Sequence, residues 1–185
     1  MKTLYIMRHG NAEPTADGGD FHRRLTATGA RDVLKGGSAL NAIGGADIIV
    51  HSPLVRTTMT AGLVAEQMKP VPEVVMSEAL RSGASADEMI RELEVYLSFE
   101  KVLFVGHMPD VAEFSCKLGS RDLLVTTIFS PGSVVACSFE GKVGAGDVEM
   151  GQTVGAKKSV GGKSSSSGGG GGNPKKVKGS GSSKY

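Results

Sequence analysis

Apolar and polar residues form two kinds of pattern along about the first 140 residues. One consists of short, nearly continuous apolar runs, and the other of longer segments with apolar residues at helical spacing. The short runs lack the polar alternation of a half-exposed strand, so they predict strands covered on both faces. The five runs are Thr3–Met7, Ala46–Val50, Glu73–Met76, Lys101–Val105 and Ser133–Phe139.

Helical spacing and start signals predict four helices between these strands. Ser52 followed by Pro53 predicts a helix start, with serine as the N-cap and proline in the first turn. Ser85 is a second such N-cap, and the last helix is expected over residues 109–118. The first helix starts near Thr26 and contains two adjacent glycines, each of which costs about 1 kcal/mol relative to alanine. The side chains expected to face the core are Ala30, Val33, Leu34, Leu40 and Ile43 in the first helix, Leu63, Val64 and Met68 in the second, and Met89, Ile90, Leu93 and Leu97 in the third.

The alternation of strands and helices indicates the fold class. It predicts an α/β domain with three layers, α/β/α, in which helices cover both faces of a mostly parallel central sheet. Ligands of such sheets bind beyond the carboxyl ends of the strands. The residues that follow each strand are therefore the first candidates for chemistry.

The composition changes at about residue 156. The segment from there to the end holds nine Gly, eight Ser and seven Lys, and such a segment cannot bury enough apolar surface to offset its ordering entropy. We predict one domain over residues 1–155 and a flexible tail over residues 156–185. A small basic cluster at 174–178 could serve as a weak address or anion-binding patch.

Charge and cysteine usage exclude several classes of protein. Seven of the 21 Lys and Arg fall in the tail, which has no Asp or Glu, so the other 14 face 19 Asp and Glu, a net charge of −5 for residues 1–155. An acidic domain is not expected to bind nucleic acid. Cys116 and Cys137 lack metal-ligand spacing and are expected to be reduced thiols. Arg8 interrupts the short apolar start and no apolar run could span a bilayer, so we expect no signal peptide, no membrane association and a cytoplasmic protein.

Cationic and imidazole side chains follow three of the predicted strands. Because parallel strands end at one edge of a sheet, two arginines and two histidines should converge there, and their repulsion calls for a bound anion. A phosphoryl group fits, since guanidinium forks match its oxygens in pairs, and the amino end of the second helix adds to the same field. Gly10 would let the backbone approach the anion, and Asn11 could add a donor. The segments are Arg8-His9-Gly10-Asn11, His51-Ser52-Pro53-Leu54-Val55-Arg56 and Gly106-His107-Met108-Pro109.

Together these segments resemble the histidine phosphatase superfamily, also called phosphoglycerate mutase-like. The similarity covers residues 1 to about 140, and the short length and the His-x-Pro form are typical of the small bacterial phosphohistidine phosphatases. The resemblance implies the phosphoglycerate mutase-like fold, with a last strand expected in the glycine-rich residues 142–154. The matching segments are residues 4–12, the R-x-L-T-x-x-G-like residues 24–29, the second-arginine segment 52–60 and the second-histidine segment 105–109.

The resemblance also implies a role for each residue of the constellation. His9 would attack phosphorus and become a phosphohistidine, while Arg8, Arg56 and His107 hold the phosphoryl oxygens. Neighbouring Arg charges should lower the pKa of His9 and keep it neutral. Glu78 is the candidate proton donor, with a solvated loop carboxylate as the alternative. No metal or other cofactor is required, because the cationic side chains supply the charge. His22, in a polar loop, and His51, at a strand end, are expected to have ordinary structural roles.

Three functions follow, in order of preference. The first is a phosphatase that removes phosphate from a phosphohistidine on a signalling protein, because imidazole can leave as a neutral group and so needs no strong proton donor. The second is a phosphomonoesterase that acts on a small sugar or nucleotide phosphate. The third is a phosphate-recognition module without turnover, which would have no need of a nucleophile at His9. In the first two, inorganic phosphate is the product.

Overall fold

The computed structural model describes residues 1–119, 129–140 and 148–154 of the chain. The predicted tail at 156–185 lies outside these residues, and the domain boundary at 155 stays a prediction. Each of the five predicted strands is present within two residues of its expected ends, and the further strand expected within residues 142–154 is present as well. The strands are β1 (Lys2–Arg8), β2 (Ile48–His51), β3 (Glu73–Met76), β4 (Lys101–Gly106), β5 (Val134–Phe139) and β6 (Val148–Val154).

The strands form one sheet in the order β3-β2-β4-β1-β5-β6. β1, β2, β3 and β4 are mutually parallel, whereas β5 runs antiparallel to β1 and β6 antiparallel to β5. The mostly parallel sheet predicted from the sequence is therefore confirmed. Its consequence for function is that the carboxyl ends of β1, β2 and β4 lie side by side at one edge.

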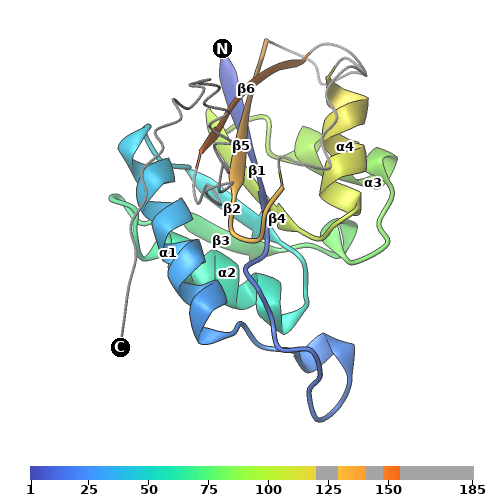
Figure 1. Cartoon of the computed structure of the whole chain (residues 1–185). Helices are drawn as coiled ribbons and strands as arrows, with labels where there is room; N and C mark the ends of the chain where they lie inside the picture. Colours follow the sequence, from blue (N-terminus) through green and yellow to red (C-terminus); the bar gives the residue numbers. More distant parts are fainter. Residues whose placement is uncertain (120–128, 141–147, 155–185) are drawn as a thin grey trace, which may run out of the picture.

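Helices cover both faces of the sheet, as predicted (Figure 1). One apolar cluster joins Tyr5, Met7 and Leu103 of the sheet to α1 and α2. A second joins Leu4, Ile6 and Phe104 to α3 and α4 on the other face. The helices are α1 (Ala27–Ala42), α2 (Val55–Ala65), α3 (Ala86–Val95) and α4 (Asp110–Leu118), with short 3-10 turns η1 (Asp20–His22) and η2 (Glu78–Leu80).

The starts of two helices confirm the sequence prediction, and a third corrects it. Thr26 caps α1, and Ser85 caps α3 in a capping box with Glu88. Ser52, however, does not cap α2, which begins at Val55 with Leu54 as its N-cap. The Ser52 hydroxyl lies 2.7 Å from Nε2 of His107 instead, so a tertiary contact takes the group that the local pattern assigns to a cap.

The two adjacent glycines do not interrupt α1, because both lie at close packing contacts. A Cβ on Gly36 would stand 2.5 Å from the carbonyl oxygen of Gly132, and one on Gly37 would stand 3.2 Å from Cα of Val64. Their helix cost is therefore offset by the close approach of α1 to its neighbours. The predicted core face of this helix is right for Val33 and Leu40 and wrong for Ile43, which follows the last turn and is exposed.

β3 differs from the prediction that every strand is covered on both faces. It is an edge strand, and three of its four residues, Glu73, Val74 and Met76, are exposed. Cys137 is buried in the core and forms no disulfide, as predicted, and burial raises its pKa to about 12. Among the described residues, no helix has both the length and the apolar character needed to cross a bilayer.

Candidate functional site

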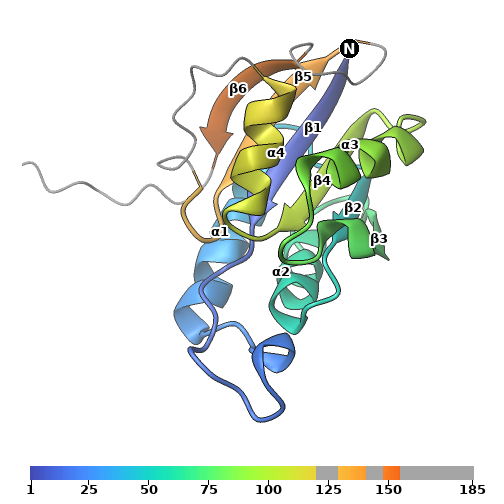
Figure 2. The ribbon, with the colours of Figure 1, turned by 90° about the vertical axis from the view of Figure 1, so that its right-hand side faces the viewer.

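The sheet brings the three predicted segments to one place. Arg8, the last residue of β1, pairs with Gly106 of β4, and His51 of β2 pairs with Val105 of β4. The backbone N–H of His9 then donates to the carbonyl of Gly106 at 3.1 Å. The loop between β1 and α1 extends past this edge and carries η1 (Figure 2). The prediction that these strand ends converge is confirmed.

His9 is held with one ring nitrogen facing the backbone. Its Nδ1 lies 2.7 Å from the carbonyl oxygen of Gly10, which can only accept, so Nδ1 carries the proton of the neutral ring. Nε2 is then left with its lone pair, as a nucleophile requires. The pKa of His9 is lowered to about 4, first by burial and then by the charges of Arg56, Arg8 and Arg23, while the Gly10 hydrogen bond opposes the shift. The expected lowering is present, and burial is its largest single cause, ahead of each arginine.

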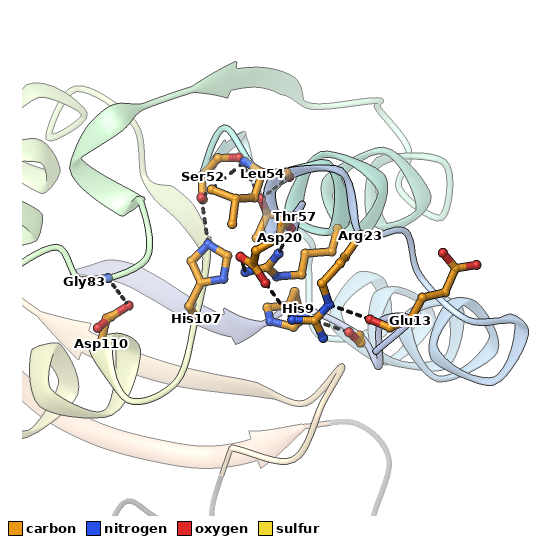
Figure 3. Close-up of polar contacts among 12 residues, drawn as sticks. His9, Glu13, Asp20, Arg23, Ser52, Leu54, Thr57, Gly83, His107 and Asp110 are labelled. Carbon is orange, nitrogen blue, oxygen red and sulfur yellow. Dashed lines mark hydrogen bonds and ion pairs between the residues drawn. The ribbon is translucent and has the colours of Figure 1, made fainter. Parts of the chain in front are cut away.

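His107 lies beside His9 and is also neutral. The two rings meet edge to face with centroids 5.2 Å apart. The pKa of His107 is lowered to about 3, mainly by burial and then by His9 and Arg56. Its Nε2 is 2.7 Å from the hydroxyl of Ser52, so Ser52 fixes the ring (Figure 3). If that hydroxyl donates to Nε2, Nδ1 of His107 carries the proton and can donate to a ligand.

Arg8 and Arg56 supply the two predicted guanidinium groups. Arg56, in the first turn of α2, is only 4% exposed. Nη1 of Arg8 donates to the carbonyl of Phe129 at 3.1 Å. In the described part of the chain, three buried site nitrogens have no hydrogen-bond partner: Nε of Arg8, Nε of Arg56 and Nδ1 of His107. Buried polar groups are almost always paired, so these nitrogens indicate a place for an external acceptor. We call Arg8, His9, Arg56 and His107 the floor of the site.

The loop after β1 adds two charged residues that the sequence did not predict, Asp20 and Arg23. Oδ2 of Asp20 accepts from Nη2 of Arg56 at 3.0 Å, and its Oδ1 accepts from Nη1 of Arg23 at 2.8 Å. Nε of Arg23 also donates to the carbonyl of Glu13 (Figure 3). Their side chains are 59% and 27% exposed, whereas that of Arg56 is 5% exposed. We call Asp20 and Arg23 the rim.

The arginine of the R-x-L-T-like segment is corrected by one position. Arg24, with which the matched segment began, is exposed, and Arg23 is the one that reaches the site. The sequence alone could have identified Arg23, because Arg23-Arg24-Leu25-Thr26 fits R-x-L-T directly with Arg23 as its first residue. Asp20 has no such signal, because nothing local distinguishes it from the other acids of the loop.

Gly10 is required for close packing, a reason that the sequence did not predict. A Cβ there would stand 2.6 Å from Cγ2 of Val33 and 2.8 Å from the carbonyl oxygen of Gly29. The glycine therefore permits close packing of the strand end on α1, while its N–H faces Oγ1 of Thr60 at 3.3 Å. The predicted role in approaching an anion stays a prediction.

The remaining candidates lie around the same edge. Asn11 is exposed, and its carbonyl oxygen accepts from the N–H of Thr26 at 2.9 Å. Glu78 is exposed at the start of η2, directly beyond the carboxyl end of β3. Roles for both in catalysis stay predictions. His51 is buried and bonded through Nδ1 to the carbonyl of Ser52 at 2.7 Å, and His22 is exposed against Phe21, as expected for structural residues.

The arrangement combines a neutral imidazole with a lone pair, two guanidiniums and several free donors. Such a set stabilises a tetrahedral or trigonal oxyanion while a ring nitrogen attacks its centre. Within the ranges that the structure covers, no group of three or more His, Cys, Asp or Glu is placed to hold a metal ion.

Comparison with known proteins agrees with this geometry. Residues 4–97 match the family model of the histidine phosphatase superfamily (branch 1). An uncharacterized protein from Picosynechococcus is 33% identical over 115 residues, which are 60% of this chain and 70% of that protein.

Solved structures share the fold at lower identity. The protein histidine phosphatase SixA, complexed with tungstate, has a TM-score of 0.73 at 18% identity, covering 83% of this chain and 96% of that one. The alpha-ribazole phosphatase from Shigella flexneri has a TM-score of 0.60 at 16% identity, covering 79% and 95%. At these identities the likeness shows a shared fold.

Proposed function

We propose that this chain, which belongs to the histidine phosphatase superfamily, is a metal-independent phosphatase that works through a phosphohistidine on His9. The single observation that carries the proposal is the floor of the site. Three of its buried nitrogens lack a protein partner in the described residues, and the same group of residues contains the His9 imidazole, which is neutral at pH values above its pKa of about 4. A phosphoryl group supplies the acceptors that the nitrogens need and the electrophile that the imidazole attacks.

The reaction proceeds in two displacements at phosphorus. Nε2 of His9 attacks in line, the bond to the leaving group breaks, and the phosphoryl group becomes attached to His9. Arg8, Arg56 and His107 hold its equatorial oxygens and stabilise the charge of the transition state. Water then attacks this phosphorus, the bond between phosphorus and Nε2 breaks, and its electron pair returns to His9. Inorganic phosphate departs with the protons of the water. The Gly10 carbonyl keeps the proton on Nδ1 throughout.

The preferred substrate is a phosphohistidine on a protein. Imidazole is a neutral leaving group, so the reaction does not depend on a strong proton donor, and Glu78, the candidate donor, is an exposed side chain. The fold similarity to a protein histidine phosphatase whose structure holds tungstate, a tetrahedral oxyanion, supports the same choice. We further propose Asn11 as an additional phosphate ligand and a cytoplasmic location for the protein.

A small phosphomonoester is the second candidate. The alpha-ribazole phosphatase has the same fold, so the fold does not select a substrate. For an ester, Glu78 would have to protonate the leaving alkoxide. Replacement of Glu78 by Gln should therefore lower kcat for an ester while leaving kcat for phosphohistidine nearly unchanged.

Trapping the intermediate tests the proposal. Wild-type protein mixed with a phosphohistidine peptide and quenched in base should gain the mass of one phosphoryl group on His9. His9→Ala should gain none and should lose activity by about 10⁴-fold or more, with its circular dichroism unchanged. His22→Ala, which removes an exposed imidazole, is the matched control. A folded His9→Ala variant with wild-type turnover would contradict the mechanism, and phosphate binding without turnover would favour a recognition module.

A further inference from the structure

We propose that Asp20 sets the leaving-group preference of this site by accepting a hydrogen bond from the second ring nitrogen of a phosphorylated histidine. This inference rests on the proposed function and deepens it, since it explains how the site would favour phosphohistidine over phosphomonoesters. It concerns the rim, whereas the mechanism above uses only the floor.

The position of Asp20 is defined by its contacts with two arginines. The Asp20 carboxylate bridges Arg23 of the same loop and Arg56 of α2. The backbone carbonyl oxygen of Asp20 also accepts from Nη1 of Arg56 at 2.8 Å. The negative charge of the carboxylate also acts on His107, where it opposes the lowering of the pKa. Because Asp20 is mostly exposed and Arg56 is buried, the carboxylate lies on the solvent side of the floor. A substrate whose phosphoryl group contacts the floor directs its leaving group outward, past Asp20.

The charge of the Asp20 carboxylate determines which leaving group it can assist. Hydrogen bonds from Arg23 and then from Arg56 lower the pKa of this carboxyl below its usual value, so it is ionised at neutral pH. An ionised carboxylate accepts hydrogen bonds and has no proton to give. It is therefore unsuited to protonate an alkoxide and well suited to pair with an N–H or a cation.

A phosphohistidine and a phosphomonoester release chemically different leaving groups. A phosphorylated imidazolium carries phosphorus on one ring nitrogen and a proton on the other, and Asp20 accepts that N–H. The lone pair of His9 Nε2 forms the new bond to phosphorus. The substrate's own P–N bond breaks, its electron pair stays on the ring, and neutral imidazole leaves with its proton still in place. No proton transfer is needed. A departing alkoxide, in contrast, develops negative charge next to the carboxylate.

Two peptides of identical sequence, one with phosphohistidine and one with phosphoserine at the same position, test the inference. The ratio of their kcat/KM values is measured for the wild type, Asp20→Asn and Asp17→Asn. Asp17 is exposed in the same loop, so its replacement removes the same charge away from the contacts described. We expect Asp20→Asn to lower the preference for phosphohistidine about tenfold or more and Asp17→Asn to leave it unchanged. Asp20→Ser serves as a second uncharged variant if Asp20→Asn does not fold.

The pH profile separates this role from mere positioning of Arg56. Because Asp20 stabilises the protonated ring in the bound substrate, the alkaline limit of kcat for phosphohistidine should move to lower pH in Asp20→Asn. If Asp20→Asn slows both peptides equally or leaves the ratio unchanged, the inference is overturned. If the wild type turns over neither peptide, the proposed function fails before Asp20 is tested. If the wild type prefers phosphoserine, the substrate assignment fails, whereas the effect of Asp20→Asn on the ratio still reports on Asp20.

Discussion

The floor and the rim of the site differ in burial and in how fully their polar groups are paired within the protein. In the floor, two guanidiniums and two imidazoles are buried, and three of their nitrogens lack a protein partner among the described residues. In the rim, Asp20 and Arg23 are more exposed and bonded to each other. The floor therefore retains hydrogen-bonding capacity for a ligand, whereas the charged groups of the rim are paired with each other, with Arg56 and with the backbone.

This difference indicates where binding free energy is concentrated. A buried donor without a partner costs stability, and that cost is recovered when an anion arrives. A solvent-exposed ion pair such as that of Arg23 and Asp20 contributes little on its own. We therefore expect changes in the floor to affect the rate strongly, and changes in the rim to affect the choice of substrate more than the rate.

The largest contrast is expected between two arginines. Arg56→Lys should lower kcat by about 10²–10³-fold, because a single ammonium cannot reproduce the fork that holds two oxygens. Arg23→Lys should lower it by about tenfold or less. Steady-state kinetics with one phosphorylated peptide measures both, and Arg24→Lys, at an exposed neighbouring position, is the control. Equal losses for Arg56 and Arg23 would mean that floor and rim do not differ in function.

Binding of inorganic phosphate should stabilise the fold through the floor. At 100 times its Kd, phosphate should raise the free energy of unfolding by about 2.7 kcal/mol. Urea denaturation with and without phosphate, at constant ionic strength set with chloride, measures the increment. The increment should shrink strongly in Arg56→Lys and persist in Arg24→Lys. Stabilisation of equal size in both variants would place the phosphate elsewhere on the molecule.

The two floor histidines should make stability depend on pH in a defined window. Their folded pKa values, about 4 for His9 and about 3 for His107, lie below the ordinary value of 6.5. Between these values the unfolded chain binds more protons, so stability is full above pH 6.5 and is lost as pH falls toward 4. The pKa of Asp20 is lowered from 3.8, so the rim loses its contribution only at still lower pH.

Urea denaturation at pH 7.5 and pH 5.0 tests that window. The wild type should lose more stability between the two than His107→Gln, which lacks one of the buried imidazoles. His22→Ala, which removes an exposed imidazole, should behave as the wild type does. A His107→Gln variant with the full wild-type loss would show that the buried ring does not cause it.

The smallest expected effect concerns the backbone beneath the floor. Gly10→Ala should destabilise the fold by about 1–3 kcal/mol, because the new methyl group would overlap Val33 and the Gly29 carbonyl. Gly62→Ala, in α2, should stabilise it by about 1 kcal/mol, because the new Cβ would have no heavy atom within 4 Å apart from the nearby backbone of its own helix. Thermal or urea unfolding measures both. A neutral Gly10→Ala would show that α1 can move away from the strand end at little cost.

Most of the fold and the floor could be predicted from local pattern. Apolar runs locate β1, β2, β4 and β5, because a strand covered on both faces must be apolar throughout. Thr26 and Ser85 mark helix starts correctly, because their caps are satisfied by N–H groups three residues away. The floor follows from the same logic, since Arg8 ends β1, His107 directly follows β4 and Arg56 opens the helix after β2. The helical connections imply that these strands are parallel.

The errors arise where a distant contact overrides a local preference. Ser52 looks like an N-cap but bonds His107, which is 55 residues away. Gly36 and Gly37 look like interruptions but permit the packing of α1 on its neighbours. Arg23 differs from Arg24 only by which of the two faces the site once the loop has closed. In the sequence, Asp20 is one of several acidic residues of its loop, and only the folding of η1 places it beside Arg56.

The sequence by itself determined the family, the layer order and the four floor residues, because these depend on periodicity and on residues adjacent to strands. The tertiary structure decided the rim, the hydroxyl that orients His107 and the close packing at Gly10. Those features depend on how the loop after β1 folds back over the sheet edge and on how closely α1 approaches that edge. Both depend on contacts between residues far apart in the chain, so no short stretch of sequence encodes them.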